Sequence, residues 1–298
     1  MHVIDIAHIT KDYGNGKGVF DVCFHADKGE VIGFLGPNGA GKTTTIRQLM
    51  GFIRPDAGSV SINGLDCFRS ADRIQQSLGY LPGEIAFLED MTGIEFIKFI
   101  ANMKHMPSLA RAEELMRFFE LDASGAIKKM SKGMKQKIGI VCAFMQNPDI
   151  LILDEPTSGL DPLMQNKFIE LLLAEKARGK TILMSSHVFE EVERTSDRTA
   201  IIRQGRIVAV ESMENLRQNK RKIYEVRFHD AQEAAAFAAA HGGAWDESGK
   251  SVTVQVAGNV DAFIKAVSAY RVEDLQGRTQ TLEELFMHFY GEEGTQNA

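Results

Sequence analysis

A glycine-rich segment near residue 40 constrains the fold of this chain more than any other feature of its sequence. It follows the apolar run 31–35, which predicts a strand, and it opens a stretch with helical spacing up to Met50. The segment consists of Gly36, Pro37, Asn38, Gly39, Ala40, Gly41, Lys42, Thr43 and Thr44. Glycines let successive backbone N–H groups surround phosphate oxygens, and the helix N-terminus adds its dipole. This spacing, in this context, predicts a P-loop rather than a turn without a ligand.

Three side chains of this loop have predicted roles in binding a nucleoside triphosphate and Mg²⁺. Lys42 is expected to reach the β- and γ-phosphates, and the Thr43 hydroxyl is expected to ligate Mg²⁺. Thr44 can add a phosphate contact. The backbone of the loop supplies the remaining donors.

Two acidic residues complete the predicted site. The apolar run 150–153 predicts a buried parallel strand, and it ends in Asp154 and Glu155. In a doubly wound sheet the C-terminal ends of the strands face the ligand crevice. We therefore expect Asp154 to hold Mg²⁺, directly or through its waters, and Glu155 to polarise an attacking water as general base.

The alternation of strand and helix patterns predicts the fold class. Strand patterns dominate the first 35 residues, helical spacing dominates about 84–146, and strands alternate with helices from residue 150 to 210. We predict an α/β fold of the P-loop NTPase type, with a mostly parallel sheet, an antiparallel β subdomain and a helical subdomain. This domain is predicted to span 1–215. The region 216–298 has the order β-α-β-β-α-β with a trailing helix near 282–290, which predicts a small α+β domain of ferredoxin-like type.

Composition and charge narrow the range of partners. The chain has 34 basic and 40 acidic residues, a net charge of −6 and no long basic run, so nucleic acid is not an expected partner. Its three cysteines form no CxxC pair, which suits a reducing cytosol. We find no signal-peptide pattern and no apolar stretch near the roughly 18 residues of a membrane helix. The chain is therefore not expected to cross a membrane by itself.

A third motif separates this chain from kinases, GTPases and helicases, which can also combine a P-loop with a strand-end acid. Met130-Ser131-Lys132-Gly133-Met134-Lys135-Gln136 opens a helix just upstream of the acidic strand. It resembles the signature sequence of the ATP-binding subunits of ABC transporters, usually written LSGGQ. The chain departs from that pattern at Met130, Lys132 and Met134, whereas the serine and the second glycine remain. The resemblance implies that Ser131 and Gly133 bind the γ-phosphate of ATP held by another subunit.

Other elements of the family occur in the family order. Ser158-Gly159-Leu160-Asp161 resembles the D-loop, which implies that Asp161 lies at a dimer seam. His187 resembles the switch histidine that contacts the γ-phosphate and positions Glu155. Tyr13 resembles the aromatic platform that stacks on adenine, although it is also compatible with a half-buried aromatic at a strand end. The resemblance covers roughly residues 1–215.

One family element is irregular in this chain. The Q-loop glutamine, which in the family helps to ligate Mg²⁺, is expected near residue 83, where the sequence has Gly83. Glu84 follows it and is a candidate replacement, because a carboxylate oxygen could meet Mg²⁺ directly or through water.

The resemblance also implies partners and a location. We expect a peripheral subunit at the cytoplasmic face of the membrane that binds ATP and Mg²⁺ and works with a separate integral-membrane permease, with export as the direction. Two subunits, identical or similar, are expected to close head-to-tail around two ATP molecules. The segment 85–105 is the implied docking region for the permease. Its candidate groove residues are Phe87, Leu88, Met91 and Phe96, with the protein core as an equally weighted alternative.

Two other functions are compatible with an ABC-type sequence. The first is a soluble ATPase that acts on ribosomes or DNA, which the single P-loop and the lack of a long coiled coil disfavour. The second is a regulatory module that holds ATP without turnover, which the presence of Glu155 and His187 disfavours.

Overall fold

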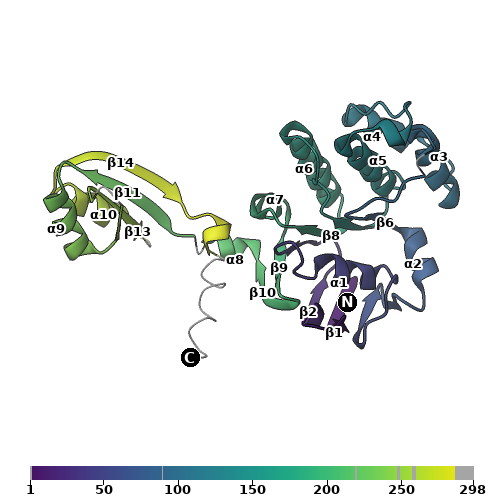
Figure 1. Cartoon of the computed structure of the whole chain (residues 1–298), viewed down its shortest axis with the longest axis horizontal. Coiled ribbons are helices and arrows are strands. Elements are labelled where there is room, and N and C mark those ends of the chain that lie inside the picture. The colour runs from purple at the N-terminus through teal and green to yellow at the C-terminus, as the bar shows by residue number, and fades with distance from the viewer. Residues whose placement is uncertain (1, 89, 219, 247–248, 257–259, 286–298) are drawn as a thin grey trace. The chain divides into compact units, whose positions relative to one another are not determined.

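The computed structural model divides the chain into two compact units, Met1–Met213 and Glu214–Ala298 (Figure 1). It describes all residues except 1, 89, 219, 247–248, 257–259 and 286–298. The first unit contains two sheets and the second contains one, and each unit has its own buried apolar core. In the described part of the chain, no helix has both the length and the apolar character needed to cross a bilayer.

The larger sheet of the first unit carries the predicted nucleotide site. Its strands are β3 (Val31–Leu35), β6 (Leu78–Leu81), β7 (Ile150–Asp154), β8 (Thr181–Ser186), β9 (Arg198–Arg203) and β10 (Arg206–Ser212). Their order is β10-β9-β3-β8-β7-β6, and all neighbours run parallel except β9 and β10. The strands β3, β7 and β8 are buried along their whole length, which explains why their sequences are apolar runs rather than alternating patterns.

A smaller antiparallel sheet packs in the same unit. Its strands are β1 (Ile4–Asp12), β2 (Gly18–Ala26), β4 (Ala57–Ile62) and β5 (Leu65–Asp66), in the order β2-β1-β4-β5. Asn63 and Gly64 connect β4 to β5, and both have the positive φ that a two-residue hairpin turn requires. Helix α1 (Lys42–Leu49) buries Ile46 and Leu49 in one apolar cluster with strands of both sheets. The P-loop helix is thereby fixed between the two sheets.

Three helices between β6 and β7 pack together as a helical region (Figure 1). They are α3 (Gly93–Met103), α4 (Ala110–Phe118) and α5 (Lys132–Phe144), with the 3₁₀ turn η1 (Ile127–Lys129) before α5. Helix α3 begins with a capping box, in which Thr92 Oγ1 accepts from the Glu95 amide and the Glu95 carboxylate accepts from the Thr92 amide. The remaining helices of the unit are α2 (Ala71–Ser77), α6 (Pro162–Ala177) and α7 (Phe189–Thr195).

The second unit is a four-stranded antiparallel sheet with two helices. Its elements are β11 (Lys222–Phe228), α9 (Ala231–His241), β12 (Ala244–Trp245), β13 (Ser251–Val256), α10 (Val260–Val267) and β14 (Val272–Thr279), preceded by α8 (Met213–Gln218). The strand order is β12-β13-β11-β14. The core contains Phe228 and Phe237, whose ring centroids lie 5.0 Å apart. Residues 282–285 are helical, and the predicted continuation of this helix to 290 lies outside the described residues.

Candidate active site

The loop between β3 and α1 lines a cavity of about 550 Å³. Gly41 is the N-cap of α1 and has a φ of 113°. A Cβ at this position would lie 2.6 Å from Cγ1 of Val19, so only glycine fits. Among the predicted site residues, the cavity is lined by Tyr13, Asn38, Gly39, Gly41, Lys42, Thr43, Thr44 and Glu155. The Tyr13 side chain is exposed on its wall, and the structure thus brings the predicted adenine platform and the predicted phosphate loop to one cavity.

The Lys42 ammonium group is buried at the base of this loop. Its Nζ donates to the carbonyl oxygens of Gly36 at 2.6 Å and Pro37 at 3.2 Å. It also lies 3.0 Å from Oε1 of Glu155, as an ion pair that lacks hydrogen-bond geometry. A buried charge requires such partners, and phosphate oxygens can take over the role of the carboxylate. Lys42 is therefore held ready to bind an anion in the cavity.

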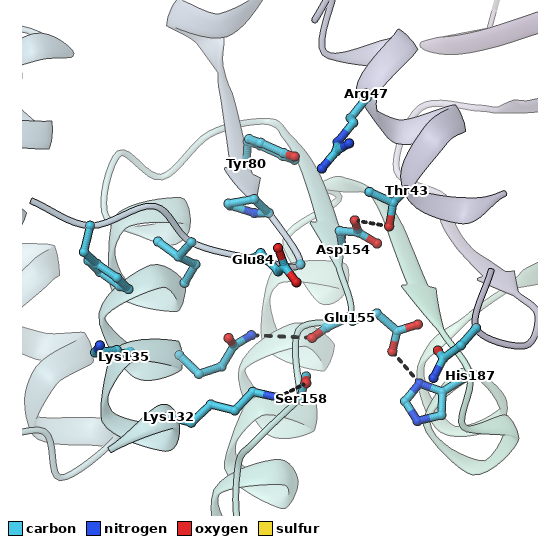
Figure 2. A pocket seen from close by; sticks show the side chains of 16 residues that line it. Thr43, Arg47, Tyr80, Glu84, Lys132, Lys135, Asp154, Glu155, Ser158 and His187 are labelled. Carbon is cyan, nitrogen blue, oxygen red and sulfur yellow. Dashed lines mark hydrogen bonds and ion pairs between the residues drawn. The ribbon is translucent and has the colours of Figure 1, made fainter. Parts of the chain in front are cut away.

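Asp154, at the end of β7, is fully buried and has two hydroxyl partners. Thr43 Oγ1 donates to its Oδ2 at 2.9 Å (Figure 2). Ser185 Oγ donates to its Oδ1 at 2.5 Å. Neither hydroxyl carries a charge that would neutralise the carboxylate. Carboxylate and hydroxyl oxygens are the donors that Mg²⁺ prefers. These oxygen ligands therefore fit a divalent cation bound between Thr43 and Asp154.

Glu155 follows Asp154 in a backbone conformation that is unusual for its residue type. Its φ is +50°, and its amide donates to Ser185 Oγ at 3.0 Å. Oε2 of the carboxylate lies 2.6 Å from Nδ1 of His187, which comes directly after β8 (Figure 2). A non-glycine residue with a positive φ of this kind is strained by about 1–3 kcal/mol, and such strain concentrates at functional sites. The carboxylate is thus held between a buried ammonium on one side and an imidazole on the other.

A second cavity, of about 620 Å³, adjoins the first and shares Asn38, Thr43 and Glu155 with it (Figure 2). Glu84 is exposed and lines this cavity together with Asp154. Its neighbour Gly83 passes close to the Asp154 carboxylate, since a Cβ at Gly83 would lie 3.2 Å from Oδ2 of Asp154. Glycine at this position therefore lets the loop backbone approach Asp154.

Comparisons with known proteins identify the family of this chain. The family model described as "ABC transporter" matches residues 19–158. Bacitracin transport ATP-binding protein BcrA of Bacillus licheniformis is 33% identical over 242 residues, which cover 80% of this chain and 79% of that protein. Linearmycin resistance ATP-binding protein LnrL of Bacillus subtilis is 36% identical over 213 residues, 70% of this chain and 68% of that protein. A solved ATP-binding subunit of an ABC transporter is 34% identical, with a TM-score of 0.65 and coverage of 72% of this chain and 92% of that one.

The chain belongs to the ATP-binding subunits of ABC transporters. The predicted family is thereby confirmed, and with it the α/β fold of P-loop NTPase type with a small α+β addition. As a member of this family, the subunit binds ATP and hydrolyses it.

Three predicted residues of the subunit lie away from its own P-loop cavity. Ser131 is the N-cap of α5, and its Oγ accepts from the Met134 amide at 3.2 Å. Gly133 lies in the first turn of that helix. Asp161 is the N-cap of α6 and accepts from the Met164 amide at 3.0 Å. Of these described residues, none lines either of the two cavities.

Several residues that shape the candidate ATP site were missed in the sequence analysis. Ser185 bonds both Asp154 and the amide of Glu155, and its place near the end of β8, two residues before His187, was the available signal. Tyr80 lines the second cavity, and burial, with a contribution from Asp154, raises its pKa to about 12, so it remains a neutral hydroxyl at neutral pH. Buried Gln136 donates to the carbonyl of Pro156 at 2.8 Å. Its position in the signature segment gave no indication of this contact.

Proposed function

We propose that this subunit hydrolyses Mg-ATP to drive export of a substrate through a separate membrane permease. The observation that carries the proposal is the connected series Lys42–Glu155–His187 beside the P-loop cavity. A module that only holds ATP has no need of a carboxylate positioned by both a lysine and a histidine. The names of the relatives, which refer to bacitracin transport and linearmycin resistance, support export as the direction.

In this proposal the P-loop cavity holds the nucleotide. Tyr13 stacks on adenine, the backbone amides of 36–41 surround the phosphates, and Lys42 and Thr44 contact phosphate oxygens. Thr43 and Asp154 hold Mg²⁺, with Glu84 as a further candidate ligand. When bound, the cation neutralises charge on the phosphate oxygens.

Glu155 and His187 are the proposed catalytic pair. A water attacks the γ-phosphorus, the bond to the leaving oxygen of ADP breaks, and the Glu155 carboxylate accepts the proton of the water. His187 holds the carboxylate by its 2.6 Å contact and is proposed to contact the γ-phosphate. Lys42, once phosphate oxygens replace Glu155 as its partner, stabilises the charge that develops on the transferred group.

A second copy of the chain, or a similar subunit, is proposed to complete each site. Ser131, Gly133 and Asp161 lie on helix N-termini that do not line the P-loop cavities of their own chain. A helix N-terminus with a serine cap suits an anion, and the γ-phosphate of the partner's ATP is the proposed ligand. ATP then bridges the two subunits, and hydrolysis reopens them.

The permease is proposed to dock beside the helical region, at the cytoplasmic face of the membrane. A largely apolar cavity of about 500 Å³ is lined there by Phe52, Ile85, Phe96 and Ile100. Phe52 and Leu88 are about half exposed, whereas Phe96 is buried at 6% and packs on Phe87 with ring centroids 4.9 Å apart. Phe96 therefore belongs to the wall of the groove rather than to its exposed rim.

We also propose domain limits of 1–215 and 216–298, close to the division between the two compact units.

Co-purification tests this function directly. The tagged chain is expressed in its native cell and purified from detergent-solubilised membranes, with the Glu155→Gln variant alongside to hold the closed state. We expect a polytopic membrane protein to be recovered with both. Wholly cytosolic recovery, with ribosomes, nucleic acid or nothing attached, would contradict the transport function and leave the ATPase chemistry intact.

A further inference from the structure

The first turn of α5 has an unfavourable charge pattern. Lys132 and Lys135 both lie in it, and the turn contains no acidic residue. Positive charges at a helix N-terminus oppose the helix dipole. Lys132 also replaces a glycine of the family signature. Residues that break a local rule in this way are expected to serve a function.

Lys132 makes a specific contact with the segment that follows the catalytic carboxylate. Its Nζ donates to Oγ of Ser158 at 3.0 Å (Figure 2). Its aliphatic stem lies against Gly159, because a Cβ at Gly159 would be 2.9 Å from Cγ and Cδ of Lys132. The side chain is thus fixed at its stem and at its tip. Among the described contacts, this hydroxyl is the hydrogen-bond partner of its ammonium group.

Two further contacts join the same helix turn to the same segment. A Cβ at Gly133 would lie 2.9 Å from the carbonyl oxygen of Gly159, so the two backbones approach closely. Gln136, one turn along, donates to the carbonyl of Pro156 at 2.8 Å. The segment 155–159 is therefore held to the start of α5 at both of its ends.

We propose that Lys132 is a positioning residue that couples the phosphate-binding turn of α5 to Glu155 through Ser158. The inference rests on the proposed function, in which Ser131 serves the ATP of the partner subunit while Glu155 acts on the ATP of its own. When the α5 turn contacts the ATP of the partner subunit, it thus constrains Glu155, which acts on the subunit's own ATP. Turnover is expected to be cooperative in ATP, and the Lys132–Ser158 hydrogen bond is expected to carry part of that cooperativity.

Five variants of the full chain test this role. Lys132→Met keeps most of the stem and removes the ammonium, Ser158→Ala removes the acceptor, and the double variant removes both. Lys135→Met is the matched control, because it removes the same charge from the same helix turn and cavity wall, and no contact of Lys135 with 155–159 is among those described. Lys132→Arg tests rescue by a second cation.

Steady-state turnover with Mg-ATP is the first readout. We expect Lys132→Met and Ser158→Ala each to lower kcat by about tenfold with KM changed less than about twofold, and to move the Hill coefficient toward 1. The double variant should resemble either single variant, because each single variant already removes the Lys132–Ser158 hydrogen bond. Lys132→Arg should retain most activity, whereas Lys135→Met, which removes a charge from the phosphate-binding turn, should raise KM more than it lowers kcat. A raised KM with unchanged kcat in Lys132→Met, or equal effects of Lys132→Met and Lys135→Met, would overturn the proposal.

Hydrogen exchange of the nucleotide-free chain is the second readout and does not depend on turnover. The amides of Ser158 and Leu160 donate to the carbonyls of Glu155 and Thr157. We expect them to exchange at least about tenfold faster in Lys132→Met and Ser158→Ala than in Lys135→Met. Equal exchange in all three would overturn the coupling. Absence of wild-type turnover, or normal turnover in Glu155→Gln, would instead contradict the proposed function, and the exchange result would still decide the role of Lys132.

Discussion

The two units of this chain differ in where they place their charges. In the first unit, Lys42 and Asp154 are buried, at 5% and 0% exposure, in contact with other polar groups of the site. In the second unit, the described ion pairs are on the surface, such as Lys265 with Asp261, whose side chains are 76% and 68% exposed. Burying charge is costly unless each group is paired, so a fold retains buried charge where it serves a purpose. From this contrast we expect the nucleotide chemistry to lie in the first unit.

The cores of the two units also differ in the side chains that form them. The first unit places its polar network at the ends of buried strands, next to an apolar cluster that extends over both sheets. The second unit builds its core from rings, with Phe228, Phe237 and Tyr270 in mutual contact. Substitutions in the polar network of the first unit should therefore affect catalysis before stability, whereas those among the core rings of the second unit should affect stability.

The largest expected effect is on catalysis. Glu155→Gln keeps the size of the side chain and removes the proton acceptor, so kcat should fall by about 10³-fold or more while ATP still binds. Phosphate release and equilibrium binding of labelled ATP measure the two quantities separately. A matched change in the second unit, Glu233→Gln, should leave kcat unchanged. Loss of ATP binding in Glu155→Gln would show that the carboxylate has a structural role instead.

A large effect on stability is expected in the second unit. Phe228→Ala removes a fully buried ring and should lower the free energy of unfolding of that unit by about 3–5 kcal/mol. The chain has one tryptophan, Trp245, which lies in β12 of this unit, so tryptophan fluorescence in urea follows its unfolding. The control Ile264→Ala, at a side chain that is 53% exposed, should change little. If Phe228→Ala also abolished turnover in the folded protein, the proposed division of roles would be wrong.

An intermediate effect, on ATP affinity, is expected at an exposed aromatic residue of the first unit. Tyr13 and Trp245 are 57% and 49% exposed, one in each unit. Tyr13→Ala should weaken ATP binding by about 1–3 kcal/mol, because stacking on a base contributes that much. Trp245→Ala should leave the affinity unchanged. Titration with a fluorescent ATP analogue measures both, and equal affinities of the two variants would remove Tyr13 from the site.

The smallest effect concerns a surface ion pair of the second unit. The hydrogen bond from Arg278 lowers the pKa of Glu284 below its usual 4.5. A lowered carboxylate pKa in the folded state gives stability that is fully present above pH 4.5 and is lost as the pH falls through the lowered value. Glu284→Gln should therefore cost less than about 1 kcal/mol at pH 7, and the difference from wild type should shrink in acid. Glu283→Gln, beside it, is the control, and a difference that grew on acidification would contradict the assigned sign.

Much of the site was predictable because it depends on local spacing. The P-loop, the acids at the end of β7 and the histidine after β8 are each defined by a strand end and a few neighbouring residues. Contacts between distant segments were not predictable. The hydrogen bond from Ser185 to Asp154 spans 31 residues and that from Lys132 to Ser158 spans 26, and serine is too common on protein surfaces to mark either contact. The approach of Gly83 to Asp154 also required the packed fold, since the sequence showed only that a glutamine was missing.

The left-handed backbone at Glu155 has a consequence for attempts to redesign this protein. Glycine and asparagine adopt a φ of +50° with less strain than glutamate does. A design procedure that chose residue 155 from its backbone alone would therefore replace the glutamate and report a more stable sequence. The same procedure would delete the carboxylate that faces Lys42 and His187. At this position, the residue that the backbone prefers and the residue that the chemistry needs are different, and selection for stability alone would produce an inactive protein.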